Sequence, residues 1–184
     1  MASQVVKLYT AIADLALRPA QERLRINYID LEDANRTGVE FGDRVKRLGP
    51  QRALNAVIVS PMTPEEQPAD AARRNVLVVQ PFNVCYIYKR EPTTELKDIV
   101  EQWADPLHDV LNAEQMRRLG NLTLTDAAGN RIGHVDGFVA FLPDFDSANN
   151  AMLYEVGLAC FDIRVEVSYR IAKDYETLPR TVRR

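Results

Sequence analysis

The stretch Phe161-Asp-Ile-Arg-Val-Glu-Val-Ser-Tyr-Arg-Ile171 decides the fold. Its odd-numbered positions hold apolar or aromatic residues, and its even-numbered positions hold charged residues or serine. Because successive side chains of a strand point to opposite faces, this alternation predicts a long strand with one face on a core. The other face must meet water or a polar partner. A slip of one residue would bury charged side chains, so the register is strongly fixed.

Other stretches predict further strands around this one. Ala53 to Val59 indicates a short buried strand, and Val76 to Tyr88 indicates a longer apolar strand that contains Pro81. Because proline cannot donate a hydrogen bond to a sheet, we expect either an edge strand with a bulge or two strands that turn at residues 80–83. From Leu122 on, two short strands are expected to flank a hairpin turn at residues 126–130.

Two segments have apolar residues at helical spacing. The first runs from the N-terminus to residue 17 and ends at Arg18-Pro19. The second follows Pro92-Thr-Thr94, and its apolar stripe comprises Leu96, Ile99, Val100, Trp103, Leu107, Val110 and Leu111. Pro106 predicts either a kink near Ala104 or a new start capped by Asp105. The elements together predict an α+β fold, with a mixed or antiparallel β-sheet packed against two main helices.

The length of 184 residues suits a single domain over residues 1–184. Residues 18–49 are charged and weakly patterned, so we expect an excursion from the core in which Leu24, Ile26 and Tyr28 could form an edge strand. Residues 62–74 and 144–152 are expected to be loops. Residues 172–184 are expected to form a C-terminal arm. We expect neighbouring chains to order this arm and the excursion.

Composition limits the possible partners. The chain has 23 Lys and Arg against 26 Asp and Glu, a formal charge of −3, which argues against a sequence-specific nucleic-acid binder. No apolar run approaches the roughly 20 residues that a membrane span needs, and no signal peptide opens the chain. We therefore expect synthesis in the cytoplasm and no membrane partner. The basic tip formed by Arg180, Arg183 and Arg184 is expected to be a solvated tail rather than a phosphate site.

The residues that could support catalysis form no recognisable motif. Two histidines and two scattered cysteines lack metal-ligand spacing, so we expect no metal site and no cofactor. Cys85 and Cys160 lie in apolar strand patterns and are expected to be buried thiols. Phosphate-loop and nucleophile-elbow motifs are absent. We therefore expect that the protein is not an enzyme. The alternative is a small enzyme or ligand-binding protein with a cleft that gathers His134, Asp136 and Asp144.

The order of these elements resembles the tail terminator (tail completion) proteins of long-tailed bacteriophages. The residues that carry the resemblance are Ala56-Val-Ile-Val59, the strand that ends Tyr86-Ile-Tyr88, the helix Leu96…Trp103…Pro106-Leu107 and the strand Ile163–Ile171. The similarity is one of pattern and element order, and it covers Met1–Leu17 and Ala53–Ile171. The chain is longer than compact members of the family in residues 18–49, 62–74 and 144–152.

The resemblance implies a virion structural protein that forms a ring, usually of six subunits, at the head-proximal end of a tail. Such a ring ends the growth of the tail tube and contacts both the tail-tube protein and the head-side connector. It implies no catalytic residues. We expect Arg164, Glu166 and Arg170 to make subunit contacts, and the basic tip to lie on an acidic surface of an adjoining subunit. Another neck or head–tail connector protein is the alternative.

Overall fold

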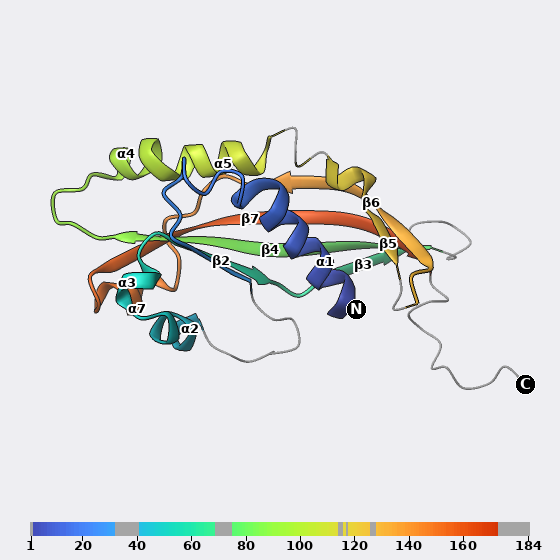
Figure 1. The fold of residues 1–184 in the computed structure, drawn as a ribbon, viewed down its shortest axis with the longest axis horizontal. Coiled ribbons are helices and arrows are strands. Elements are labelled where there is room, and N and C mark those ends of the chain that lie inside the picture. The colour runs from blue at the N-terminus through green and yellow to red at the C-terminus, as the bar shows by residue number, and fades with distance from the viewer. Residues whose placement is uncertain are drawn as a thin grey trace, which may run out of the picture.

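The computed structural model describes residues 2–31, 41–68, 75–113, 116, 118–125 and 128–172. These residues form one curled, seven-stranded sheet with helices packed on it (Figure 1). The main strand order is β1-β2-β4-β7-β6-β5, and β3 also pairs with β4. The pair β1–β2 is parallel and the other described pairs are antiparallel. The predicted α+β class with a mixed sheet is confirmed.

The elements have the following bounds. The strands are β1 (Tyr28–Leu31), β2 (Ala56–Pro61), β3 (Glu65–Pro68), β4 (Asn75–Lys89), β5 (Thr123–Thr125), β6 (Arg131–Ala140) and β7 (Leu158–Ala172). The helices are α1 (Ala2–Ile12), α2 (Phe41–Leu48), α3 (Pro50–Ala53), α4 (Leu96–Ile99), α5 (Asp105–Leu111) and α7 (Asn150–Tyr154). The described residues also form two π-helical turns, η1 (Ala13–Leu17) and η2 (Val100–Ala104), and one 3-10 turn, η3 (Arg118–Asn121).

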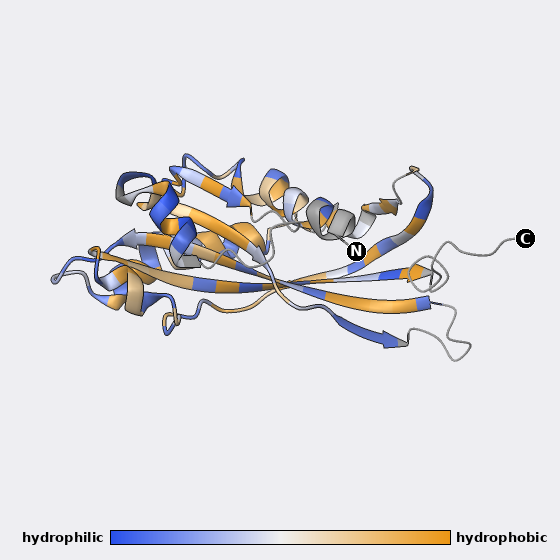
Figure 2. Ribbon diagram, turned by 90° about the horizontal axis from the view of Figure 1, so that it is seen from below, coloured by the Kyte–Doolittle hydropathy of each residue, from blue (hydrophilic) through white to orange (hydrophobic). Residues whose placement is uncertain are grey.

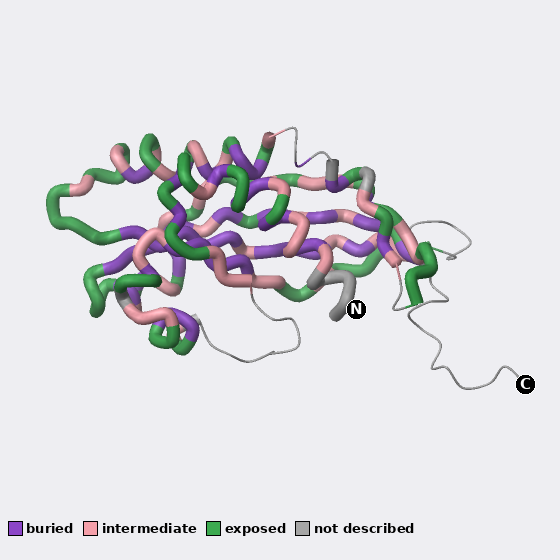
Figure 3. Tube along the Cα trace, in the orientation of Figure 1, coloured by how far each residue is buried: buried purple, intermediate pink, exposed green. Residues whose placement is uncertain are grey.

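The alternating stretch lies in β7, which is central as its pattern predicts. It pairs with β4 along all 15 residues of both strands, and β6 lies on its other side. The six apolar side chains of the alternation are buried: Phe161, Ile163, Val165, Val167, Tyr169 and Ile171. Figure 3 shows this buried band along the central strands of the sheet.

Strand β4 is continuous and central, so both sequence-based alternatives for Pro81, an edge strand and two separate strands, are wrong. Pro81 is tolerated because the neighbouring strand breaks beside it. Strand β2 ends at Pro61 and β3 begins at Glu65, and the chain between them passes Pro81. Residues 62–74 therefore are not only a loop, because β3 pairs with Val76–Val79 of β4. The polar sequence of β3 concealed this strand.

Two helical segments cover the first face of the sheet, as predicted (Figure 1). One is α1 with η1, and the other is the continuous run α4–η2–α5. The π turn η2 ends just before Pro106, where a regular helix would bring the proline ring against the carbonyl of Gln102. Asp105 already has helical backbone angles, so Pro106 distorts the helix near Ala104 and does not restart it. Leu96 is 57% exposed, and its place on the buried stripe was wrongly predicted.

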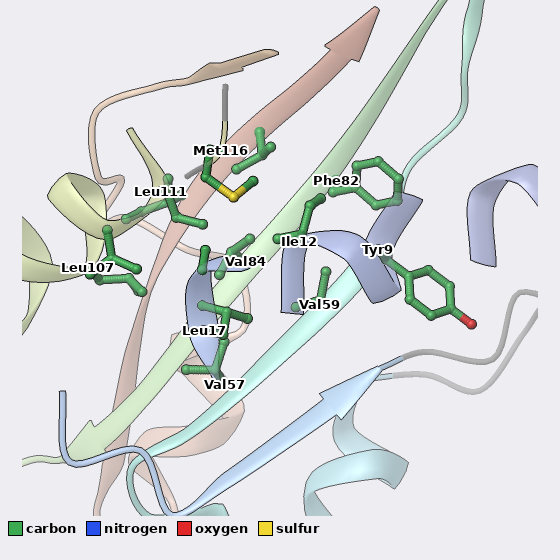
Figure 4. Packing of buried hydrophobic residues seen from close by; sticks show 14 of the residues in the cluster. Tyr9, Ile12, Leu17, Val57, Val59, Phe82, Val84, Leu107, Leu111 and Met116 are labelled. Atoms are coloured by element: carbon green, nitrogen blue, oxygen red, sulfur yellow. The ribbon is translucent and has the colours of Figure 1, made fainter. Parts of the chain in front are cut away.

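The main core lies between these helices and the sheet (Figure 4). The side chains that meet there come from α1 and η1 (Tyr9, Ile12 and Leu17), β2 (Val57 and Val59), β4 (Phe82 and Val84), α5 (Leu107 and Leu111) and the following turn (Met116). Each fully buried large apolar side chain contributes about 1.5–3 kcal/mol before the entropy cost of ordering it. Packing on this first face fixes the position of the sheet, and the sheet in turn positions the residues on its second face.

The second face of the sheet is covered at one end by α2, α3 and α7. A smaller core lies under these helices and comprises Val45, Ala53, Ile58, Cys85, Ile87, Leu153, Leu158 and Cys160. Helix α2 is also held by Arg44, whose guanidinium donates to the Asp30 carboxylate at 2.8 Å and to the Ser60 hydroxyl at 3.2 Å. The predicted loop at 144–152 thus contains part of a helix, α7.

The described part of the segment 18–49 belongs to the core rather than leaving it. Leu24 and Ile26 are buried, and the buried Tyr86 hydroxyl donates to the Leu24 carbonyl at 3.0 Å. The expected edge strand is present as β1, slightly later in the chain than its predicted apolar positions. Residues 173–184 of the predicted arm lie outside the described residues. No described helix is long and apolar enough to cross a membrane.

Candidate interaction surface

The part of the second face that α2, α3 and α7 leave uncovered is the candidate functional surface, called here the open face. It is built from three adjacent strands, and its members are Leu77 and Val79 of β4, Arg164, Glu166, Ser168 and Arg170 of β7, His134, Asp136 and Val139 of β6, and Phe141 just beyond β6. Figure 2 shows hydrophilic and hydrophobic colours alternating along the strands, with a helical layer on one side of the sheet. No helix among the described residues packs on the open face.

Arg164 and Glu166 form an ion pair along β7, with an N–O distance of 2.6 Å. Their side chains are 46% and 25% exposed. The guanidinium of Arg164 also lies 5.8 Å from the centre of the Phe141 ring. The pair is therefore satisfied within the subunit, yet it remains accessible to a neighbouring molecule.

A second charged group lies nearer the other end of β7. The Asp136 carboxylate accepts from Arg170 Nε at 2.8 Å and lies 2.9 Å from His134 Nε2. The β6–β7 register shifts between Val135 and Gly137, so Asp136 is the extra residue of a bulge. The bulge directs this carboxylate to two partners, one on each strand.

The open face also presents apolar side chains. Val139 is 53% exposed and Phe141 43%, while Leu77 and Val79 are half-buried. The stretch Phe138-Val-Ala-Phe-Leu142 is apolar throughout, so its pattern alone does not show which of its side chains are exposed. Val139 lies directly opposite Glu166, so its position on the polar face follows from the β6–β7 register, which the sequence does not reveal.

The structure does not gather the three residues of the predicted enzyme cleft. His134 and Asp136 lie together, but Asp144 pairs through its backbone with Asp162. On β7 that point is eight residues from Arg170, about 26 Å along an extended strand. A hollow of about 350 Å³ next to Asp136 is lined by Asn112, Ala113, Met116, Gly120, Gly137 and Phe138. Neither His134 nor Asp144 lines it.

The structure describes only some of the residues that are predicted to make subunit contacts. Arg164, Glu166 and Arg170 lie on the open face, and their contact with another subunit stays a prediction. Arg180, Arg183 and Arg184 lie outside the described residues. The open face thus brings the predicted β7 residues together with apolar side chains whose position no local sequence pattern reveals.

The two cysteines are buried as predicted, but they are not isolated. The sulfur atoms of Cys85 and Cys160 and a carboxylate oxygen of Asp162 all lie within 4.8 Å of one another. Burial raises the pKa of Cys85 well above its usual value, and neighbouring Cys160 and Asp162 raise it further. The thiol form is therefore favoured. This grouping depends on the register between β4 and β7, so sequence spacing could not predict it.

No protein-family model matches the chain, and no curated protein matches it in sequence.

Proposed function

We propose that this protein is a virion structural protein that forms a ring at the head-proximal end of a phage tail. In this role it ends the tail tube and joins the tube to the neck. The observation that supports the proposal best is the open face, which combines exposed apolar side chains with charges in a subunit whose opposite face packs against helices to form the main core. Large exposed apolar side chains that cluster on a rigid sheet are typical of a protein-binding surface.

The chemistry of the open face suits contact between subunits. Val139 and Phe141 offer apolar area, and the Arg164–Glu166 and Arg170–Asp136 pairs offer charges of both signs. In a closed ring, each subunit presents one surface to the next and a different surface to the previous one. Charged groups around an apolar patch fix the register of such a contact more than they add to its affinity.

The order of the elements supports the same proposal, because it is the order on which the resemblance to tail terminator proteins rests. The partners would be further copies of this chain, in a ring of six, together with a tail-tube protein and a head-side connector. Another neck or connector protein of the same virion would fit the open face equally well. An enzyme has less support, because His134, Asp136 and Asp144 do not converge on one cleft.

Electron microscopy of the purified protein tests the proposal. We expect rings with a central channel and six-fold symmetry in two-dimensional class averages. A population of particles no larger than a monomer or dimer, at concentrations where other ring proteins assemble, would contradict it.

A further inference from the structure

A group of three possible metal ligands lies where the smaller core meets the open face. Cys85 of β4 is directly opposite Asp162 of β7, and Cys160 precedes Asp162 by two residues on the same face of β7. Both sulfur atoms and one carboxylate oxygen lie within 4.8 Å of one another. Cys85 and Cys160 are buried, whereas Asp162 is half-buried at the edge of the group. The longest strand pair of the sheet therefore holds the three side chains together.

One oxygen of the Asp162 carboxylate lacks a hydrogen bond. This atom, Oδ1, is buried and has no hydrogen-bond partner among the described residues. Arg164 is two residues away on the same face, but it pairs with Glu166. The Asn150 amide is nearby, but it binds the backbone of Cys160. A buried carboxylate oxygen without a partner is costly, so a cation at this position would relieve the cost.

We propose that Cys85, Cys160 and Asp162 bind a thiophilic divalent cation, Zn²⁺, as three protein ligands with water as the fourth. Two sulfur ligands favour Zn²⁺ over Mg²⁺ or Ca²⁺, which prefer oxygen ligands. Tetrahedral zinc has Zn–S distances of about 2.3 Å, which place two sulfur ligands roughly 3.8 Å apart. The present separations are within 4.8 Å, so the ligand atoms would have to approach one another by at most about 1 Å when the ion binds.

The surroundings of the three ligands support a built site. The Asn150 amide accepts from the Cys160 N–H at 2.7 Å and donates to the Cys160 carbonyl at 3.1 Å, so it fixes the backbone of one ligand. The same amide donates to the Phe145 carbonyl at 3.0 Å, which ties the site to the preceding loop. Such supporting hydrogen bonds orient metal ligands in advance of binding. Asp162 is the accessible member and marks the side from which the ion enters.

Cobalt spectroscopy tests the site, because Co²⁺ bound by thiolates absorbs in the near-ultraviolet and visible ranges. The full chain, kept reduced, is titrated with Co²⁺ and then with Zn²⁺. We expect thiolate-to-cobalt absorption that saturates at one equivalent and is lost when Zn²⁺ displaces the cobalt. Asp162→Asn should weaken Co²⁺ binding at least tenfold. Asp144→Asn is the matched control, because Asp144 is the backbone partner of Asp162 and its exposed carboxylate lies outside the group.

Two results would overturn the proposal. The first is wild-type protein with both thiols reduced that gives no thiolate-to-cobalt absorption at one equivalent. The second is an Asp162→Asn variant that binds Co²⁺ as tightly as the wild type, which would remove the carboxylate from the ligand set. Cys85→Ala and Cys160→Ala should each abolish the absorption. If either cysteine variant does not fold, the wild-type spectrum and the Asp162→Asn titration still decide the matter.

Discussion

The Gln80 side chain donates a hydrogen bond from Nε2 to the Met62 carbonyl at 2.7 Å, in the place where the backbone of residue 81 cannot. The Met62 N–H donates to the Pro81 carbonyl at 2.9 Å, and a regular antiparallel pair would return a bond from residue 81 to the Met62 carbonyl. Pro81 has no N–H to give. The same Gln80 nitrogen also donates to the Pro81 carbonyl at 2.9 Å. Gln80 therefore explains how a central strand contains a proline.

The first prediction concerns this donor. Gln80→Glu removes both N–H groups and places a buried carboxyl group against two carbonyl oxygens, so it should lower the free energy of unfolding by about 2 kcal/mol or more at pH 8. Burial raises the pKa of the new carboxyl, so the loss should be smaller at pH 5, where the group is protonated and can donate. Urea denaturation at both pH values measures the effect. Gln67→Glu, on the exposed side of β3, is the control and should change stability by about 0.5 kcal/mol at most.

A pair of valines tests the assignment of the two faces of the sheet. Val165 is buried in the main core, and Val139 is 53% exposed on the adjacent strand. Val165→Thr buries a hydroxyl group and should cost about 1–3 kcal/mol, whereas Val139→Thr should change stability by about 0.5 kcal/mol or less. Thermal and urea unfolding of the two variants measure the difference. Equal losses would mean that the faces are wrongly assigned.

Alkaline pH should destabilise the fold through its buried tyrosines. Burial raises the pKa of Tyr88 to about 12 and also raises that of Tyr86. A tyrosine in the unfolded chain titrates near pH 10, so the folded state keeps protons that the unfolded state loses. The contribution of these tyrosines to stability should therefore be constant up to about pH 10 and then fall by roughly 1.4 kcal/mol per pH unit for each of the two. Tyr88→Phe should reduce this slope, and an unchanged slope would contradict the burial of Tyr88.

Periodicity predicted the strands and helices that have one buried face. The alternation in residues 161–171 is an example, because a period of two with a packed face allows one register only. Strand β3 was missed because Glu65-Glu-Gln-Pro68 has no apolar pattern, and its pairing with β4 depends on the backbone alone. The rule for proline correctly predicted a missing hydrogen bond at Pro81. The rule could not predict that the partner strand would break at the same place.

The residues of the open face and of the cysteine group come together through the pairing of strands that lie far apart in the sequence, which no local sequence pattern reveals. The open face was half predicted, because the alternation identified Arg164, Glu166 and Arg170 but not the strand beside them. Val139 and Asp136 reach the same face through the register and the bulge of β6. Cys85 and Cys160 are 75 positions apart in the sequence and meet because β4 and β7 pair in one register. Such long-range pairing is set by the whole core.

Charge reversal on the open face separates assembly from folding. Arg164→Glu places like charges side by side at an exposed position, so it should cost at most about 1 kcal/mol of monomer stability but impair assembly. The double variant Arg164→Glu with Glu166→Arg restores an ion pair within the subunit and should recover that stability. It should still assemble poorly, because a neighbour would meet reversed charges. If the double variant recovers both stability and assembly, Arg164 contributes only to contacts within its own subunit.

Sedimentation velocity of the wild-type chain and of Val139→Ser tests the central claim most directly. Val139 is 53% exposed on the open face, so its replacement should leave the monomer folded while it removes apolar contact area from the interface. Val156→Ser, at an apolar position that is also 53% exposed but lies outside the open face, is the matched control. We expect a species of about six subunits for the wild type and the control, and mostly monomer for Val139→Ser at the same concentration. A wild-type chain that sediments as a monomer at every concentration, or a Val139→Ser variant that assembles as the wild type does, would contradict the proposed ring.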